Sequence, residues 1–184
     1  MTTQSQQLPP EAILMRMLFG YAISRSIGVA AELGIADLVK EESKTADDLA
    51  TQTGSHPRSL YRLLRACASV GIFTEDSSHR FGLTPLAEFL RSDNPASLKN
   101  FAEMLTNETQ FQMWAELPHS VRTGDPTFDH VFGTPVFEYY AANPKVGALF
   151  NKGMTSLSMG ASMAVVTRIV PTMSPYTVIE AVAV

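Results

Sequence analysis

Residues 45–83 read TADDLATQTGSHPRSLYRLLRACASVGIFTEDSSHRFGL, and this stretch decides the fold. Thr45 belongs to the residue types that cap helix N-termini, and Asp47 and Asp48 follow where acidic side chains favour the helix dipole. Gly54 ends this short helix, because glycine readily takes the left-handed conformation found after a helix C-terminus. The stretch therefore begins with a short, well-bounded helix.

A second helix and two short strands complete this stretch. Ser55 is expected to cap the second helix, with Pro57 in its first turn. Apolar side chains then recur at helical spacing and predict a core stripe of Leu60, Leu63, Leu64, Cys67 and Val70. Residues 72–74 and 80–83 are apolar and suit two strands joined by a polar turn. Two helices followed by a hairpin indicate a winged helix-turn-helix.

Before this unit, the sequence predicts a tail over residues 1–10 and one long helix over 11–33. The helix is apolar around nearly its whole circumference, so it must be buried on all sides. A partner subunit is the favoured way to bury it, and a central helix in a monomer is the alternative. The two methionines among its apolar residues, Met15 and Met17, suit an adaptable interface.

After this unit, further helices are expected over residues 84–91 and 96–105. Another starts near Glu108 and is kinked by Pro118. A short aromatic helix follows Thr134-Pro135, and a long helix runs from 144 to about 170. The run 177–184 is apolar and of strand type. The fold class is mainly α, with one small β-hairpin and a single strand at the end.

Composition sets limits on the class of protein. The 184 residues are 45% hydrophobic and 17% charged, with a formal net charge of −4, which argues against a nucleic-acid binder. The only cysteine, Cys67, is expected to be a small buried hydrophobe. No signal peptide and no membrane-spanning segment are expected, so the cytoplasm is the predicted location. The four histidines lack metal-ligand spacing, so no metal site is predicted.

The order of these elements resembles the two-domain, dimeric O-methyltransferases of natural-product biosynthesis, which include caffeate-type, hydroxyneurosporene-type and polyketide-type enzymes. The resemblance covers residues 12–179 and rests on several short motifs in order: TADDLA from Thr45, LYRLLR from Leu60, GIF from Gly71, FGLT from Phe81, the run from Trp114 to Gly133, and FNKGM from Phe150.

The resemblance implies an S-adenosylmethionine (SAM) cofactor, a homodimer and a small aromatic or polyketide-like hydroxyl substrate. It implies a dimerisation and winged-helix domain over 11–142, a linker helix over 143–171, and the start of a Rossmann-like SAM-binding domain over 172–184. Met154 and Ser158 would contact the cofactor. Phe150, Asn151 and Trp114 would line the substrate pocket. The alternative is that the apolar residues at 150, 154 and 157 are one core-facing side of an amphipathic helix.

The end of the sequence departs from the family pattern. Glu180 matches the acidic position of the first SAM-domain strand, but Val182, Ala183 and Val184 stand where the family has glycines. Their side chains would block the close backbone approach that glycine allows. The chain alone is therefore expected to lack tight SAM binding and turnover, with no catalytic residue assigned. A shortened enzyme, a natural truncation and a domain supplied in trans remain open.

Two other classes of function remain possible. Arg58, Arg62 and Arg65 share one face of the second winged-helix helix, as in a DNA-binding regulator. Against this, the expected wing carries only Arg80, beside Glu75 and Asp76. The other class is an interaction module that pairs with a full-length methyltransferase through the apolar first helix.

Overall fold

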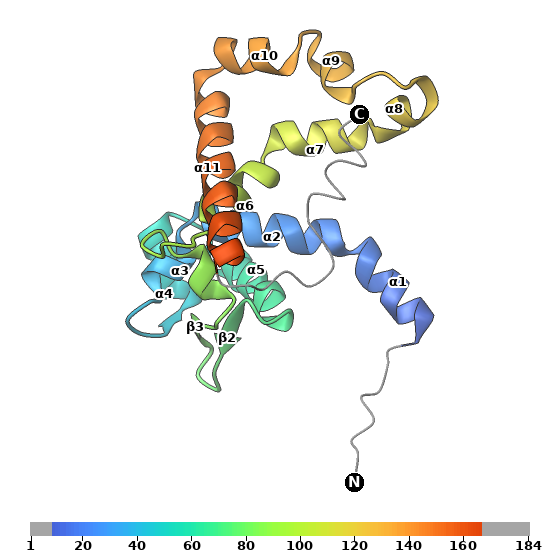
Figure 1. The fold of residues 1–184 in the computed structure, drawn as a ribbon. Coiled ribbons are helices and arrows are strands. Elements are labelled where there is room, and N and C mark those ends of the chain that lie inside the picture. The colour runs from blue at the N-terminus through green and yellow to red at the C-terminus, as the bar shows by residue number, and fades with distance from the viewer. Residues whose placement is uncertain (1–8, 167–184) are drawn as a thin grey trace.

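The computed structural model describes residues 9–166 as a mainly helical protein with one small sheet (Figure 1). The first elements are α1 (Pro10–Leu18), α2 (Gly20–Glu32), α3 (Ile35–Leu38), β1 (Lys44–Thr45), α4 (Ala46–Thr53), α5 (Pro57–Ser69), β2 (Phe73–Glu75) and β3 (Arg80–Leu83). The remainder are the 3-10 helix η1 (Ala87–Leu90), α6 (Lys99–Leu105), α7 (Glu108–Ala115), α8 (Leu117–Thr123), α9 (Thr127–Phe132), α10 (Val136–Ala142) and α11 (Pro144–Val166). This confirms the predicted fold class. The strand expected at 177–184, with Glu180, lies outside the described residues.

The winged-helix unit forms as its sequence predicts. The Thr45 hydroxyl accepts a hydrogen bond from the Asp48 amide at 3.2 Å, and the Asp48 carboxylate accepts from the Thr45 amide at 3.3 Å. This capping box satisfies amide groups that the first turn of α4 leaves without partners. Gly54 ends α4 in the left-handed conformation, with φ at 67°. The N-cap of α5 is His56 rather than the predicted Ser55, because the following Pro57 already occupies the first helical position.

The sheet has three antiparallel strands in the order β1-β3-β2, one more than the predicted hairpin. Phe73 pairs with Leu83, and Lys44 pairs with Phe81. β1 is only two residues long, too short for the alternation of side chains to indicate a strand from sequence. Phe73 and Phe81 are buried and meet the α5 stripe, where burial raises the pKa of the Cys67 thiol to about 11. Cys67 is therefore the buried apolar residue that was predicted.

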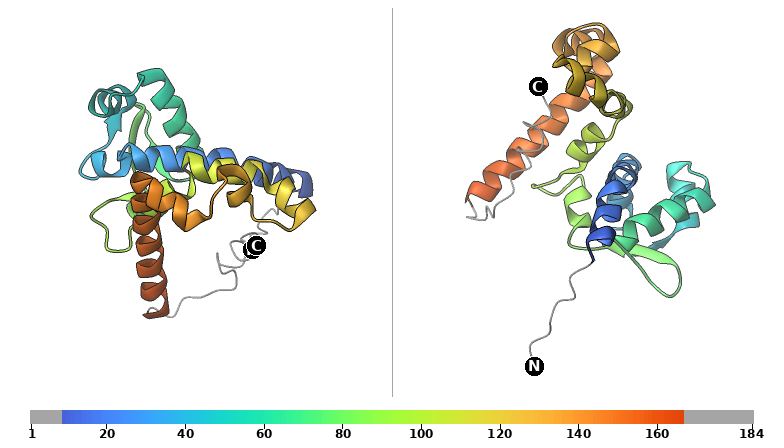
Figure 2. Two further views of the ribbon diagram at one scale, coloured as in Figure 1. Left: turned by 90° about the horizontal axis from the view of Figure 1, so that it is seen from above. Right: turned by 90° about the vertical axis from the view of Figure 1, so that its right-hand side faces the viewer.

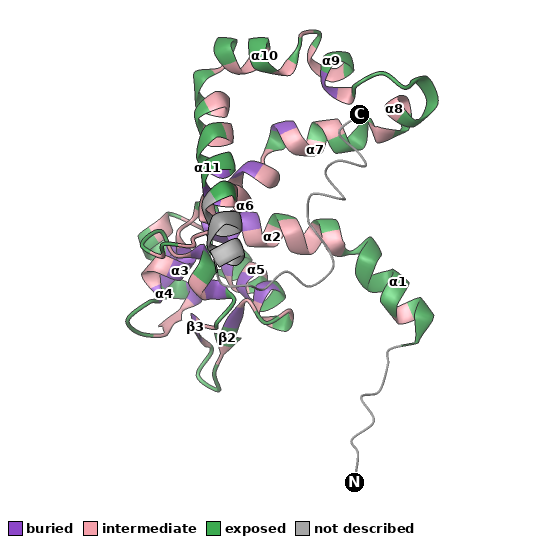
Figure 3. Ribbon diagram, viewed as in Figure 1, coloured by how far each residue is buried: buried purple, intermediate pink, exposed green. Residues whose placement is uncertain are grey.

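The long N-terminal helix is broken, which corrects the expectation of one helix over 11–33. α1 and α2 meet at Phe19 and are bent by 45°. Gly20 starts α2, and glycine weakens a continuous helix at that point. α1 has no buried residue, and its apolar side chains are exposed, with Met17 at 71% (Figure 3). Among the described residues no single helix is long and apolar enough to cross a membrane; α1 and α2 reach that threshold only as a bent pair.

Other boundaries differ from the predictions in smaller ways. The residues after Thr84-Pro85 form the short η1 instead of a helix to Arg91, and α6 begins at Lys99 instead of residue 96. Pro118 does not kink a helix. It lies in the first turn of a new helix, α8, where a missing amide donor costs nothing. α9 was not predicted, because its six residues are too few for a helical pattern to emerge.

Helix α6 connects the winged-helix unit to the long α11. α6 packs against α2 on one side and against α11 on the other, and the two views of Figure 2 show α11 leaving this junction as a straight rod. Both contacts depend on glycine. A Cβ on Gly28 would overlap the side chain of Thr106 just after α6, and a Cβ on Gly153 would lie 2.6 Å from the Met104 Cβ. Close helix approach at these two positions therefore fixes where α11 lies.

A partly buried ion pair also ties α6 to α3. Lys99 Nζ lies 3.0 Å from Asp37 Oδ2, and Asp37 Oδ1 accepts hydrogen bonds from the Ser92 amide at 2.7 Å and the Ser92 hydroxyl at 2.9 Å. Burial alone would raise the pKa of the Asp37 carboxyl, but the hydrogen bonds from Ser92 and Lys99 outweigh it, so the pKa is lowered from the ordinary value of 3.8.

The Asp37 carboxylate should make stability depend on pH. Because its pKa is lower in the folded state, its contribution is fully present above the unfolded pKa and disappears as the pH falls through the folded value. Asp37→Asn should lower the free energy of unfolding by about 1–2 kcal/mol at pH 7 and by less at pH 3. Urea unfolding at pH 7, 5 and 3 measures this, with the exposed Glu41→Gln as control. An Asp37→Asn deficit that stays constant over this range would contradict the prediction.

Candidate functional site

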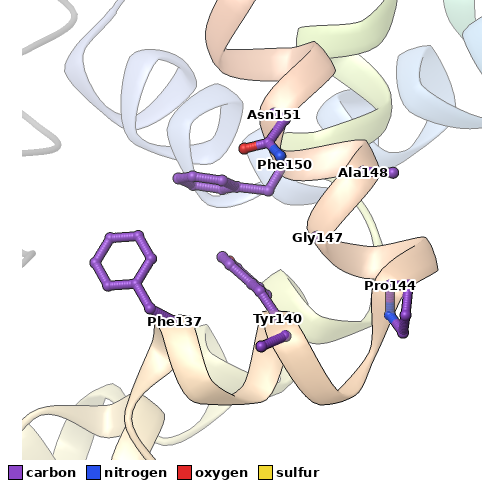
Figure 4. A pocket seen from close by; sticks show the side chains of 8 residues that line it. Phe137, Tyr140, Pro144, Gly147, Ala148, Phe150 and Asn151 are labelled. Atoms are coloured by element: carbon purple, nitrogen blue, oxygen red, sulfur yellow. The ribbon is translucent and has the colours of Figure 1, made fainter.

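The candidate site is a hollow of about 470 Å³ at the corner where α10 meets α11 (Figure 4). Its lining residues come from these two helices and the turn between them: Phe137, Tyr140, Ala141, Pro144, Gly147, Ala148, Phe150 and Asn151. The volume lies within the range of about 300–1,000 Å³ that is typical of small-molecule sites. The lining is mainly apolar and aromatic, with few polar groups, which is also typical of such sites.

The sequence forms this corner because Asn143-Pro144 stops one helix and starts the next. Asn143 leaves the helical conformation at φ −122°, ψ 75°, and Pro144 begins α11 at a position that needs no amide donor. Gly147 then lets α11 approach the end of α10, since a Cβ there would lie 2.9 Å from the Tyr140 carbonyl oxygen. The corner therefore depends on Asn143, Pro144 and Gly147, of which Asn143-Pro144 already indicated a helix boundary in the sequence.

A series of touching aromatic rings places Phe150 and Tyr140. The ring centroids of Tyr140 and Phe150 lie 4.8 Å apart, and the Tyr140 ring also meets Phe128 at 6.0 Å. Phe128 is buried and packs on Phe132 at 4.6 Å, which in turn packs on Tyr139 at 4.6 Å. Because each ring is held by its neighbour, α9, α10 and α11 form one packed group around the hollow.

Two polar groups lie among these apolar walls. Burial raises the pKa of the Tyr140 phenol, so its hydroxyl remains a neutral hydrogen-bond donor at physiological pH. Asn151 lines the hollow with an amide that both donates and accepts. Within residues 9–158, neither the Tyr140 hydroxyl nor the Asn151 side-chain amide has a hydrogen-bond partner. Both groups are therefore available to a bound hydroxyl or carbonyl group.

The structure brings together only some of the residues predicted to form the site. Phe150 and Asn151 line the hollow. Met154 and Ser158 follow on the next turns of α11, and Met154 is 39% exposed. Trp114 lies on α7, is 45% exposed and does not line the hollow. Sequence reasoning missed Phe137 and Tyr140, although the aromatic cluster around residue 139 was a signal for them.

The opposite side of α11 holds it against α6. Gly153 is buried over Met104, and the Asn100 amide donates a hydrogen bond of 3.5 Å to the hydroxyl of the buried Ser156. Phe150 and Asn151 therefore project from a helix whose rotation is fixed by packing rather than by the ligand.

One of the three winged-helix arginines, Arg65, is paired with an acidic side chain. Arg65 lies 3.4 Å from the Glu75 carboxylate, and its guanidinium lies over the Tyr61 ring at 5.9 Å. The Tyr61 hydroxyl donates to the same carboxylate at 2.9 Å. The His79 Nδ1 atom lies 2.8 Å from the Glu75 carboxylate. The contacts of Glu75 with His79, Tyr61 and Arg65 together lower the pKa of its carboxyl group. An acid thus neutralises part of the surface that a DNA-binding protein would present.

No cluster that would hold a metal ion occurs among the described residues. The nearest grouping is the parallel stack of His119 and His130, with ring centroids 3.7 Å apart and Glu116 at 3.8 Å from the second ring. Stacked rings point their nitrogen lone pairs within parallel planes rather than toward a common centre. This pair therefore stabilises the contact between α8 and α9 instead of forming a metal site.

Comparison with known proteins identifies related sequences. Residues 15–93 match the family described as "O-methyltransferase dimerisation domain". This match covers α2 to η1, and so the winged-helix unit, together with the last four residues of α1.

A relative from Lysobacter antibioticus, named phenazine O-methyltransferase PhzM, is 41% identical over 159 residues. The alignment covers 86% of this chain and 46% of the relative. The chain thus spans about half the length of the curated relatives that it matches.

Solved structures agree with this relationship. A crystal structure of LaPhzM superposes with a TM-score of 0.81 at 40% identity, covering 91% of this chain and 50% of the other. The structure of the O-methyltransferase NcsB1 from neocarzinostatin biosynthesis, in complex with SAM and 2-hydroxy-5-methyl naphthoic acid, superposes with a TM-score of 0.68 at 32% identity, covering 83% of this chain and 46% of the other. The similarity extends beyond the winged-helix unit to most of the described residues.

Proposed function

Because this chain belongs to the SAM-dependent small-molecule O-methyltransferases and corresponds to their N-terminal dimerisation region, we propose that it supplies the acceptor-binding wall of such an enzyme. Its substrate would be a small aromatic or polyketide-like hydroxyl compound. The observation that carries the proposal is the aromatic hollow at the α10–α11 corner, with Phe150 and Asn151 on its wall. The boundary between the N-terminal region and the linker helix is proposed at 143, where α10 ends.

The hollow suits the chemistry of methyl transfer to a hydroxyl group. Flat aromatic walls bind a planar ring by stacking, while the Tyr140 hydroxyl and the Asn151 amide orient its polar substituents. A site with few water molecules favours the transfer, because the positive charge of the sulfonium is lost along the reaction. Relatives whose names specify phenazine and naphthoate compounds support a planar aromatic acceptor.

Met154 and Ser158 are the proposed contacts for the cofactor, which supplies an electrophilic methyl group when bound. The exposed thioether of Met154 offers a polarizable apolar surface, and Ser158 offers a hydroxyl on the next turn of α11. Both residue types fit the methionine end of SAM. The stretch 144–158 contains no carboxylate to hold a ribose, so these contacts account for only part of a cofactor site. Tight SAM binding by this chain alone is therefore not expected.

The exposed α1 is the proposed dimer contact. Its uncovered apolar side chains include Leu14, Met15 and Met17. Contiguous exposed apolar surface of this kind marks an interaction site in a folded protein. The family's description as a dimerisation domain supports a second copy of the same chain as the partner.

Binding of the demethylated cofactor, S-adenosylhomocysteine, tests this proposal together with the oligomeric state. On one sample, calorimetry is expected to detect no binding tighter than about 100 µM, and light scattering is expected to give a dimer. Micromolar binding would contradict the expectation that Met154 and Ser158 form only part of the cofactor site. A monomer that remains a monomer at high concentration would contradict the assignment of α1 to the dimer contact. If α1 forms the dimer contact, Met17→Asp should weaken the dimer and lower the mass measured by light scattering. An unchanged mass in this variant would also contradict the assignment.

A further inference from the structure

Phe137 is unusually exposed for a phenylalanine in a folded region. It is 73% exposed, although it lines the hollow at the α10–α11 corner. In Figure 4 its ring projects from α10 on the same side as the ring of Phe150 on α11, with open space between the two. Among the described residues its ring contacts no other aromatic ring, in contrast to Tyr140, whose ring meets Phe150. An uncovered aromatic ring beside a pocket is typical of a group that contacts a ligand.

The helical spacing of α10 places Phe137 and Tyr140 in a row along the hollow. Residues three apart lie on the same face of a helix, about 5–6 Å apart at their Cβ atoms. Tyr140 is already packed against Phe150, with 4.8 Å between ring centroids. Phe137 therefore lies about one aromatic ring's width further out than the Tyr140–Phe150 pair.

We propose that Phe137 is a specificity-determining residue, which stacks on the second ring of a fused aromatic acceptor. This inference rests on the proposed function. A one-ring acceptor that stacks beside Tyr140 and Phe150 leaves Phe137 uncovered. A two-ring acceptor extends to Phe137 and covers its exposed face. The energy gained there acts only on the larger acceptor, so Phe137 selects for ring number rather than for binding in general.

The tested contrast is between a two-ring and a one-ring ligand of similar polarity. The probes are 1,4-dihydroxy-2-naphthoic acid and salicylic acid, titrated into the full chain and followed by NMR shifts. Phe137→Ala is expected to weaken naphthoate binding about fivefold, the effect of losing one aromatic stacking contact. Salicylate binding should change by less than twofold. Phe137→Tyr, which keeps the ring, should retain the preference for the naphthoate.

The matched control is Phe89→Ala, which removes another exposed phenylalanine on η1, away from the hollow. It should leave both affinities unchanged. Equal weakening of both probes by Phe137→Ala would overturn the inference, because Phe137 would then support the hollow rather than select the ligand. Unchanged binding of both probes in Phe137→Ala would overturn it as well, while leaving the proposed acceptor hollow intact.

Two further outcomes separate this inference from the proposed function. Failure of both probes to shift the α10 and α11 signals of the unmodified chain would overturn the acceptor hollow itself, and the role of Phe137 with it. A change from dimer to monomer in Phe137→Ala, measured by light scattering, would show that a second copy covers this ring. That result would overturn the role of Phe137 in ligand selection and make it a subunit contact.

Discussion

Replacing Phe81 with alanine is expected to lower the free energy of unfolding by about 4 kcal/mol. Phe81 lies on the central strand β3, is fully buried, and meets the Tyr61 ring edge-on at a centroid distance of 5.9 Å. Removing the ring leaves a cavity between the sheet and α5. Because the three strands of the sheet are only two to four residues long, few other contacts compensate.

Chemical denaturation followed by circular dichroism measures this effect, and the melting temperature should fall by about 10 °C. Phe89→Ala is the control, since Phe89 is 43% exposed and its removal should cost less than about 1 kcal/mol. Similar losses for the two variants would mean that the sheet does not pack on α5 as described.

Replacing Gly153 with leucine is expected to cost about 3 kcal/mol and to separate α11 from α6. A Cβ at this position lies 2.6 Å from both Cβ and Sδ of Met104, which is itself buried. Leucine favours helix formation more than glycine does, so any loss of stability comes from packing and not from the helix itself. Phe150 and Asn151 would move with α11, and the hollow would change shape.

Urea unfolding and hydrogen exchange of the α11 amides measure this effect. Lys152→Leu is the control, because Lys152 is the exposed neighbour on the same turn. The double variant Gly153→Leu with Met104→Ala should recover only part of the loss, because alanine removes the Sδ and Cγ contacts of Met104 but keeps the Cβ that lies 2.6 Å away. Equal stability of Gly153→Leu and Lys152→Leu would contradict the close contact between α6 and α11.

The winged-helix unit was predictable because its signals are local. The capping box at Thr45 and Asp48, the left-handed Gly54 and the apolar stripe of α5 act over a few residues each. The start of α11 at Pro144 was predictable for the same reason. β1 was missed because two residues become a strand only when Phe81 and Arg80 pair with them.

The site was only partly predictable. Phe150 and Asn151 line the hollow, but their predicted contact with the substrate stays a prediction, as does the predicted contact of Met154 and Ser158 with the cofactor. Trp114 was predicted to line the same pocket, but it lies on a different helix, α7, and outside the hollow. Phe137 and Tyr140 line the hollow because α10 and α11 meet at a corner. The residue pattern within either helix does not predict the angle between the two helices.

By itself, the sequence determined the helices and the hairpin of the winged-helix unit and the start of α11 at Pro144, with ends that lie within a few residues of those observed. These properties follow from propensity, capping and periodicity, which act between near neighbours along the chain. Only the tertiary structure decided the 45° bend at Phe19 and which side chains surround the hollow. Those features depend on distant helices meeting at glycines such as Gly28 and Gly153, where the missing side chain matters only because of what lies opposite it.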